Sequence, residues 1–256
     1  MLFSAATFAQ TTVWNPAANN PSDGLWSTAE NWTNDVPTDA GKAVFNVPDA
    51  MACKVNSVEV VNQFVQGDGG PGDTLIIADG GSLTTGGTWS AVGYNNTATM
   101  LVESGSAITF GSHLWIGLNG GADANVHLNG GVINVTEMFA LDWNQSGNKD
   151  TLFLNSGLLN LAQLHGTKSI GDNSLISISG GMIKIAGDKT ADVNAYVDAG
   201  KIAGDFTVLY DTVGNYTAVV GAPASATKWN PLTDGNNLWD NWLNWTDFNV
   251  PDSNKV

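Results

Sequence analysis

Residues that could do acid–base or metal chemistry are few in this chain and widely spaced. It has three histidines, nine lysines and no arginine. Cleavage of a polysaccharide needs either a cationic base or a cluster of carboxylates on one face of the protein. Lys149, Lys168 and Lys184 instead stand at different positions of the sequence repeat described below. We therefore expect no catalytic residue.

Metal ligands are equally sparse. His113 and His165 occupy nearly equivalent positions two periods of the repeat apart, which is about 10 Å in a stack of strands and too far to share one ion. Asp68 and Asp73 flank a glycine-rich loop that could offer oxygen ligands to calcium, but it lacks the Asp-x-Asp-x-Asp-Gly spacing of a calcium loop. The favoured interpretation is two surface histidines and an ordinary loop, with no metal and no cofactor.

The elements that carry these residues follow an internal repeat. A polar marker with a glycine occurs five times, at spacings of 25, 25, 26 and 24 residues: Asp79-Gly80-Gly81, Ser104-Gly105-Ser106, Asn129-Gly130-Gly131, Asn155-Ser156-Gly157 and Ser179-Gly180-Gly181. The positions three before and four after each marker are always aliphatic: Ile76, Leu101, Val126, Leu152 and Ile176, then Leu83, Ile108, Ile133, Leu159 and Ile183. Two further columns are apolar except for Glu103 and Thr85.

This pattern predicts an all-β fold. Apolar residues alternate with period 2, which is typical of half-buried strands, and the glycine between two strands allows a sharp corner. A third short strand is predicted at Val92-Gly93, Ile116-Gly117, Leu141-Asp142 and Ile170-Gly171. Three strands in about 25 residues predict one coil of a right-handed parallel β-solenoid, although an antiparallel sandwich also has strands at regular intervals.

A second, longer repeat divides the chain. Trp14-Asn15-Pro16 recurs as Trp229-Asn230-Pro231, and Asn31-Trp32-Thr33 recurs as Asn244-Trp245-Thr246. We predict a signal-peptide remnant at 1–9, a Trp-rich head or cap at 12–50, the solenoid at 51–190, closing strands at 191–222 and the start of a second head at 228–256. The closing strands are expected at 196–202, 207–210 and 216–220.

The two heads allow two interpretations. Tryptophans can stack on sugar rings, but Trp with Pro and Asn at regular spacing is also typical of a packed cap, which the open end of a solenoid requires. The second head has no coils behind it, so its apolar residues need another surface. We therefore predict self-association through four residues: Leu238, Trp239, Trp245 and Val250.

Composition limits the partners. The net charge is -15, and a chain without arginine is unsuited to binding nucleic acid. The apolar start that closes on Thr7-Phe8-Ala9 is typical of the end of a secretory signal, the alternative being a packed apolar strand. No apolar run reaches the roughly 18 residues of a membrane-spanning helix.

The head resembles a known family. Gly24-Leu25-Trp26, Asn31-Trp32 and Val36-Pro37, followed by Ala43-Val44-Phe45, are similar to the G-x-W-x-x-x-x-N-W head of secreted bacterial proteins with autotransporter-associated β-strand repeats. The Gly-Gly coils, such as Gly130-Gly131-Val132-Ile133, resemble the same group. The resemblance implies a secreted or cell-surface β-solenoid and no catalytic residues.

These observations predict an extracellular structural or adhesive module that is not an enzyme. It would form part of a tandem array or a head-to-tail fibre, so its main partner would be another copy of itself. The alternative is a secreted protein that binds or cleaves a surface polysaccharide, which an acidic or aromatic strip along one face would favour.

Overall fold

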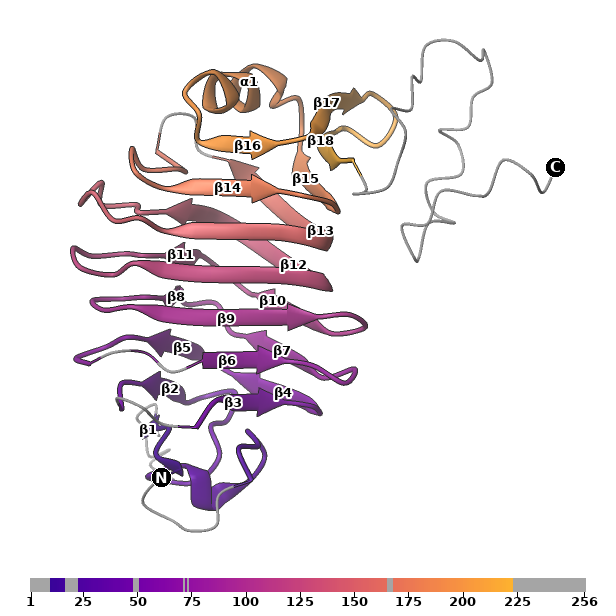
Figure 1. Ribbon diagram of the computed structural model, residues 1–256. Coiled ribbons are helices and arrows are strands. Elements are labelled where there is room, and N and C mark those ends of the chain that lie inside the picture. Colours follow the sequence, from indigo (N-terminus) through magenta and orange to yellow (C-terminus); the bar gives the residue numbers. More distant parts are fainter. Residues whose placement is uncertain are drawn as a thin grey trace, which may run out of the picture.

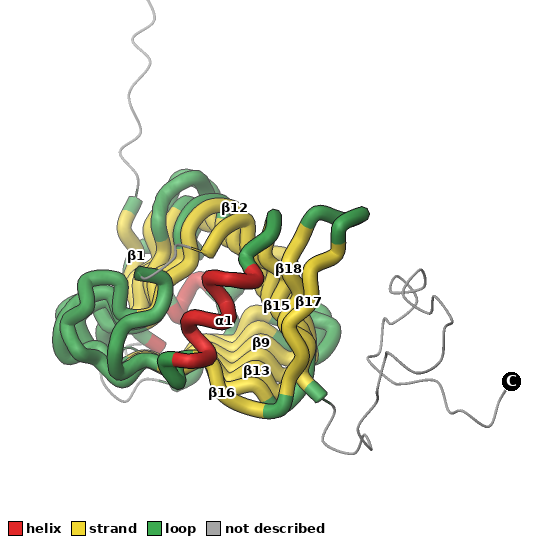
Figure 2. The backbone as a smooth tube through the Cα atoms, turned by 90° about the horizontal axis from the view of Figure 1, so that it is seen from above, coloured by secondary structure: helices red, strands yellow, loops and turns green. Residues whose placement is uncertain are grey.

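The fold is a parallel β-solenoid of about six turns with about 25 residues per turn, in a computed structural model that describes residues 10–16, 23–47, 51–70, 72, 74–164 and 168–222. Each turn contributes strands to three faces that surround one apolar core. Figure 1 shows the turns stacked along the long axis of the molecule, and Figure 2 shows the three-sided section from the end. The predicted solenoid is confirmed, and the antiparallel sandwich is excluded.

The three faces are built from equivalent strands of successive turns. Face 1 contains β3 (Cys53–Val55), β6 (Thr74–Ile77), β9 (Ala98–Glu103), the first parts of β12 (Ala124–Leu141) and β13 (Thr151–Leu164), β14 (Leu175–Ile178) and β16 (Ile202–Gly204). Face 2 contains β4 (Val58–Val61), β7 (Ser82–Thr85), β10 (Ala107–Phe110), later parts of β12 and β13, and β15 (Met182–Ala186). Face 3 contains β1 (Thr11–Val13), β2 (Lys42–Phe45), β5 (Gln63–Gln66), β8 (Ser90–Val92), β11 (Leu114–Ile116) and the end of β12.

Stacked aliphatic side chains form the core. Ile133 pairs with Ile108 on one side and Leu159 on the other, and none of the three is exposed to solvent. The column after the marker is therefore confirmed. Glycines with positive φ make the corner beside it, for example Gly80 at 78° and Gly105 at 75°, a conformation that costs other residues energy.

The core residues predicted three positions before the marker are wrong in two of the five coils. Leu75 and Met100 face the core opposite Val126, whereas the predicted members Ile76 and Leu101 lie on the outer surface beside His127. A register shift between β9 and β12 at Asn129 and Gly130 causes the error, because the corner has one residue more in the two earlier coils. The corrected inner column has Val102 where Glu103 had interrupted the pattern.

Thr85 is a true exception within an apolar column. It is buried opposite Val61, and its hydroxyl oxygen accepts a hydrogen bond from the Gly111 backbone N–H at 3.2 Å. The hydroxyl is therefore satisfied inside the core.

Candidate functional site: the two ends of the solenoid

The first head is a packed cap at the amino-terminal end. Trp14, Trp26 and Trp32 surround Phe45, with the Trp26 and Trp32 ring centroids 4.9 Å apart at an angle of 70°. All four side chains are buried, and Trp32 Nε1 donates a hydrogen bond to the Trp26 carbonyl at 2.7 Å. Buried rings cannot stack on a sugar, so the cap interpretation holds for the first head.

The head also covers the strand edges of two faces. On face 1, the Trp26 N–H donates to the Lys54 carbonyl at 2.9 Å and the Lys54 N–H donates to the Gly24 carbonyl at 2.8 Å. On face 3, β1 pairs with β2, and the Thr33 N–H donates to the Val13 carbonyl at 3.0 Å beyond it. The head thus pairs with the first strand of the solenoid on each of these two faces.

Face 2 is left open at this end. β4 pairs with β7 on one side, and no strand among the described residues pairs with its other edge. Val58 and Val60 project outward from this strand and are 82% and 46% exposed. An open edge with apolar side chains is a ready template for another strand.

The carboxyl-terminal end is closed by a helix and a hairpin. The stretch 196–202 was predicted as a strand, which is wrong: α1 (Thr190–Asp198) precedes β16 and lies across the end of the core in Figure 2. Val193 and Tyr196 are its buried residues, three positions apart as on one helix face. The other two closing strands are confirmed as β17 (Phe206–Asp211) and β18 (Tyr216–Gly221).

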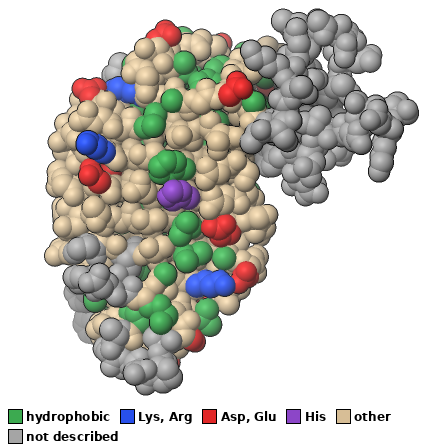
Figure 3. Space-filling model, viewed as in Figure 1, with side chains coloured by type: hydrophobic (Ala, Val, Ile, Leu, Met, Phe, Trp, Pro, Cys, Tyr) green, Lys and Arg blue, Asp and Glu red, His purple; other side chains and the backbone are tan. Residues whose placement is uncertain are grey.

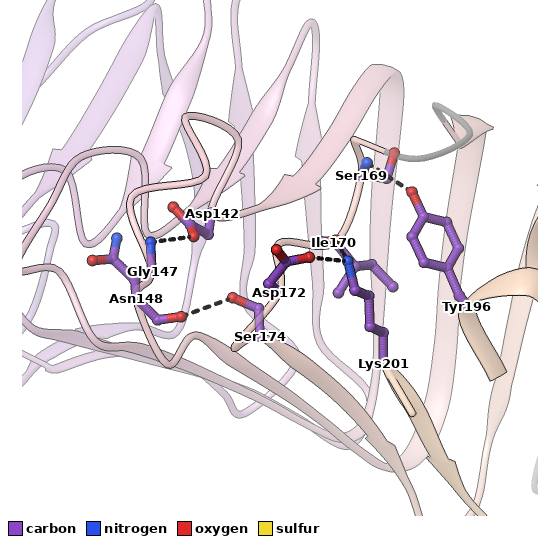
Figure 4. Close-up of polar contacts among 9 residues, drawn as sticks. All are labelled: Asp142, Gly147, Asn148, Ser169, Ile170, Asp172, Ser174, Tyr196 and Lys201. Atoms are coloured by element: carbon purple, nitrogen blue, oxygen red, sulfur yellow. Dashed lines mark hydrogen bonds and ion pairs between the residues drawn. The ribbon is translucent and has the colours of Figure 1, made fainter. Parts of the chain in front are cut away.

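Polar contacts fix this end to the last coil (Figure 4). The Tyr196 hydroxyl accepts a hydrogen bond from the Ser169 N–H at 2.9 Å. Lys201 Nζ donates to the Ile170 carbonyl at 3.0 Å and to the Asp172 carboxylate at 2.8 Å, and the latter contact lowers the pKa of Asp172. The hairpin adds to face 2 because β18 pairs antiparallel with β15.

An aromatic cluster lies outside the core on face 3. Trp115 and Trp143 stack with centroids 5.2 Å apart, and Trp89 and Tyr94 stack at 5.4 Å. Lys168 Nζ lies 5.7 Å from the centre of the Trp143 ring. Much of each ring face is thus already in contact with another side chain, although the cluster does follow one face of the solenoid.

A second strip of apolar side chains follows the outer surface of face 1. It consists of Ile76, Leu101, His127 and Phe153 at equivalent positions of successive strands, with the last two rings stacked 4.5 Å apart. Figure 3 shows this line of hydrophobic side chains with a histidine among them. Partial burial lowers the pKa of His127, which favours a neutral ring.

The charged groups singled out from the sequence remain dispersed. His113 Nδ1 lies 3.0 Å from Glu137, and Asp68 pairs with Lys42 at 3.1 Å. His165, Asp73 and the four predicted self-association residues (Leu238, Trp239, Trp245 and Val250) lie outside the described residues. Within the described ranges, no group of three or more histidine, cysteine or acidic side chains could hold a metal ion.

Two buried carboxylates were not predicted from the sequence. Asp150 stands in a column with Ala98 and Ala124, and its Oδ1 accepts a hydrogen bond from the Ala124 N–H at 2.8 Å. Burial, and to a smaller extent the charge of nearby Asp142, raise the pKa of Asp150 to about 8 against the effect of that hydrogen bond. Asp142 itself accepts from the Gly147 N–H at 2.9 Å (Figure 4), so it holds a loop.

Comparisons with known proteins give no relative. No family model, no curated protein and no solved structure matches the chain. None of the helices in the described part of the chain is both long and apolar enough to cross a membrane. The fold and the two ends are therefore the basis for any statement about function.

Proposed function

We propose that the chain is a unit of an extracellular structural or adhesive array, not an enzyme, in which units join end to end. The observation that carries this proposal is the packing of the first head. It closes the amino-terminal end of its own solenoid with buried tryptophans, and a similar sequence begins at Trp229. A second head would close the end of a following unit in the same way.

Composition supports an extracellular place for such an array. Only 13% of the residues are charged, all nine cations are lysines, and the apolar start of the chain is typical of a secretory signal. The resemblance of the head to autotransporter-associated β-strand proteins agrees with this setting.

The test is association of the purified full chain compared with a chain that ends at Ala222. The full chain should form head-to-tail oligomers at high concentration, seen by sedimentation velocity and electron microscopy. The shorter chain should keep the β-sheet circular dichroism spectrum and should associate much more weakly. Equal association of both chains would contradict a role for residues 229–256 but would still agree with end-to-end association of the units.

A second candidate function is polysaccharide binding, favoured by the aromatic cluster on face 3. Aromatic side chains provide stacking area, and the acidic protein would suit a neutral polymer better than an anionic one. Affinity electrophoresis in gels that contain neutral polysaccharides would detect binding. A Trp143→Ala variant should then migrate as if no polymer were present, whereas unchanged retardation of the variant would exclude the cluster as the binding site.

A further inference from the structure

We propose that face 2 is the docking surface between units: β17 in one copy pairs in parallel with β4 in the next copy, through edges that no strand among the described residues occupies. This inference rests on the proposed end-to-end association and names the strands that carry it. It does not require residues 229–256.

The direction of the strands permits this pairing. From β4 to β15, every strand on face 2 is parallel to its neighbour. β18 is antiparallel to β15, and β17 is antiparallel to β18, so β17 runs in the same direction as β4. A copy translated along the solenoid axis would therefore place β4 beside β17 in a parallel ladder, and a contact of this kind repeats without closing.

Exposed apolar side chains mark the same two ends. The large hydrophobic side chains exposed among the described residues are Met51 at 50%, Val58 at 82%, Val60 at 46%, Tyr210 at 37% and Val213 at 95%. Met51 lies just before β3, the two valines belong to β4, and Tyr210 and Val213 belong to β17 and its hairpin turn. Between the ends, the apolar strip on face 1 and the aromatic cluster on face 3 are only partly exposed, so the most exposed large apolar side chains of the described residues lie at the ends.

Neither edge carries a lysine or a proline, two of the residues with which natural proteins block open edges. β4 does carry one acidic residue, Glu59, which pairs with the buried Leu83 and accepts a hydrogen bond from the Ser57 hydroxyl. β4 reads Val-Glu-Val-Val and β17 reads Phe-Thr-Val-Leu-Tyr-Asp, with no lysine and no proline in either. The head covers the edges of faces 1 and 3 and leaves β4 open, so a strand from a preceding unit has a place to add.

Charge placed on β4 tests the proposal in the full chain. The double variant Val58→Lys, Val60→Lys should weaken association at least tenfold in sedimentation velocity, because it puts two lysines at the proposed junction. The matched control is Ala162→Lys, Gln163→Lys, which adds the same charge at two exposed positions of β13. The control should associate like the wild type.

The outcomes separate this pairing from the proposed function. A full chain that stays monomeric at the highest concentration contradicts both. Association that the β4 lysines leave unchanged contradicts the pairing alone. Association that persists without residues 229–256 but is lost with the β4 lysines supports the pairing and removes the second head from the contact.

Cross-linking then tests which strands meet. The native Cys53 is buried, so single cysteines at Val60→Cys and Tyr210→Cys offer the accessible thiols. A short bis-maleimide should link a mixture of the two variants into dimers, and neither variant alone. Dimers of the Val60→Cys variant alone would show that two β4 edges meet each other, which would overturn the head-to-tail pairing.

Discussion

Equivalent side chains of successive coils contact one another directly, on the surface as well as in the core. Asn119 Nδ2 donates to Asn95 Oδ1 at 2.8 Å, and Asn144 Nδ2 donates to Asn119 Oδ1 at 2.8 Å. A second amide ladder joins Asn155 to Asn129 at 2.8 Å. Such ladders satisfy amide groups along the corners and hold the coils in register.

Burial of Ile133 in the core column predicts that a charge at this position destabilises the fold. Ile133→Asp should lower the free energy of unfolding by at least about 3 kcal/mol, because a carboxylate would be buried without a partner. Thermal unfolding followed by circular dichroism measures this. Val132→Asp is the control, since Val132 faces outward on the same strand and is only half-buried. If both variants melt alike, Ile133 does not face the core.

Asp150 predicts a specific pH dependence. Its pKa is about 8 in the folded protein and 3.8 in the unfolded chain, so between these values the folded state holds a proton that the unfolded state has lost. The stabilisation is complete below pH 3.8 and is lost as the pH rises through about 8. The melting temperature of Asp150→Asn relative to the wild type should therefore increase from pH 4 to pH 8.

Asp205→Asn is the control for that measurement because Asp205 is exposed. Its melting curve should follow the wild type at every pH. A constant difference between Asp150→Asn and the wild type over the same range would show that Asp150 is ionised in the folded protein.

Among the elements, the cap can be tested by removing one ring. Trp32 packs edge-on against Trp14 and Trp26 and is 4% exposed. Trp32→Ala should cost about 3–5 kcal/mol of stability, because it leaves a cavity and loses the bond to the Trp26 carbonyl. Urea unfolding measures this, with Trp89→Ala as control. Trp89 is half-buried outside the core, so its loss should cost less than half as much.

The strands were predictable because apolar residues and glycine markers recur at regular spacing along the sequence. The elements that were assigned wrongly show where this spacing is not enough. The inner column of the two coils before the bulge at Asn129 was predicted one residue away from its true position, because a glycine marker fixes the place of the corner but not the number of residues in it. Helix α1 was assigned as part of a strand although Val193, Tyr196 and Val197 follow a helical spacing. A single short helix after five β coils is hard to recognise, because the preceding pattern favours more strands.

For the whole molecule, the sequence predicted the architecture better than the contact surface. The cap followed from seven tryptophans in two similar heads, and burial of the first head supports it. The open edge at β4 could not be predicted, because it depends on which strand edges the head covers in three dimensions. Asp150 was missed for a similar reason: nothing in its neighbourhood along the sequence marks it as buried.

The near-constant length of the coil has a consequence for how such a protein can change. Each coil bonds only to the one before and the one after, so duplicating one coil in register would recreate contacts that already exist. Every added coil would lengthen the rod by about 4.8 Å and leave the cap and the hairpin unaltered. The spacing between the two ends could thus be adjusted during evolution in small, equal steps, without redesign of either end.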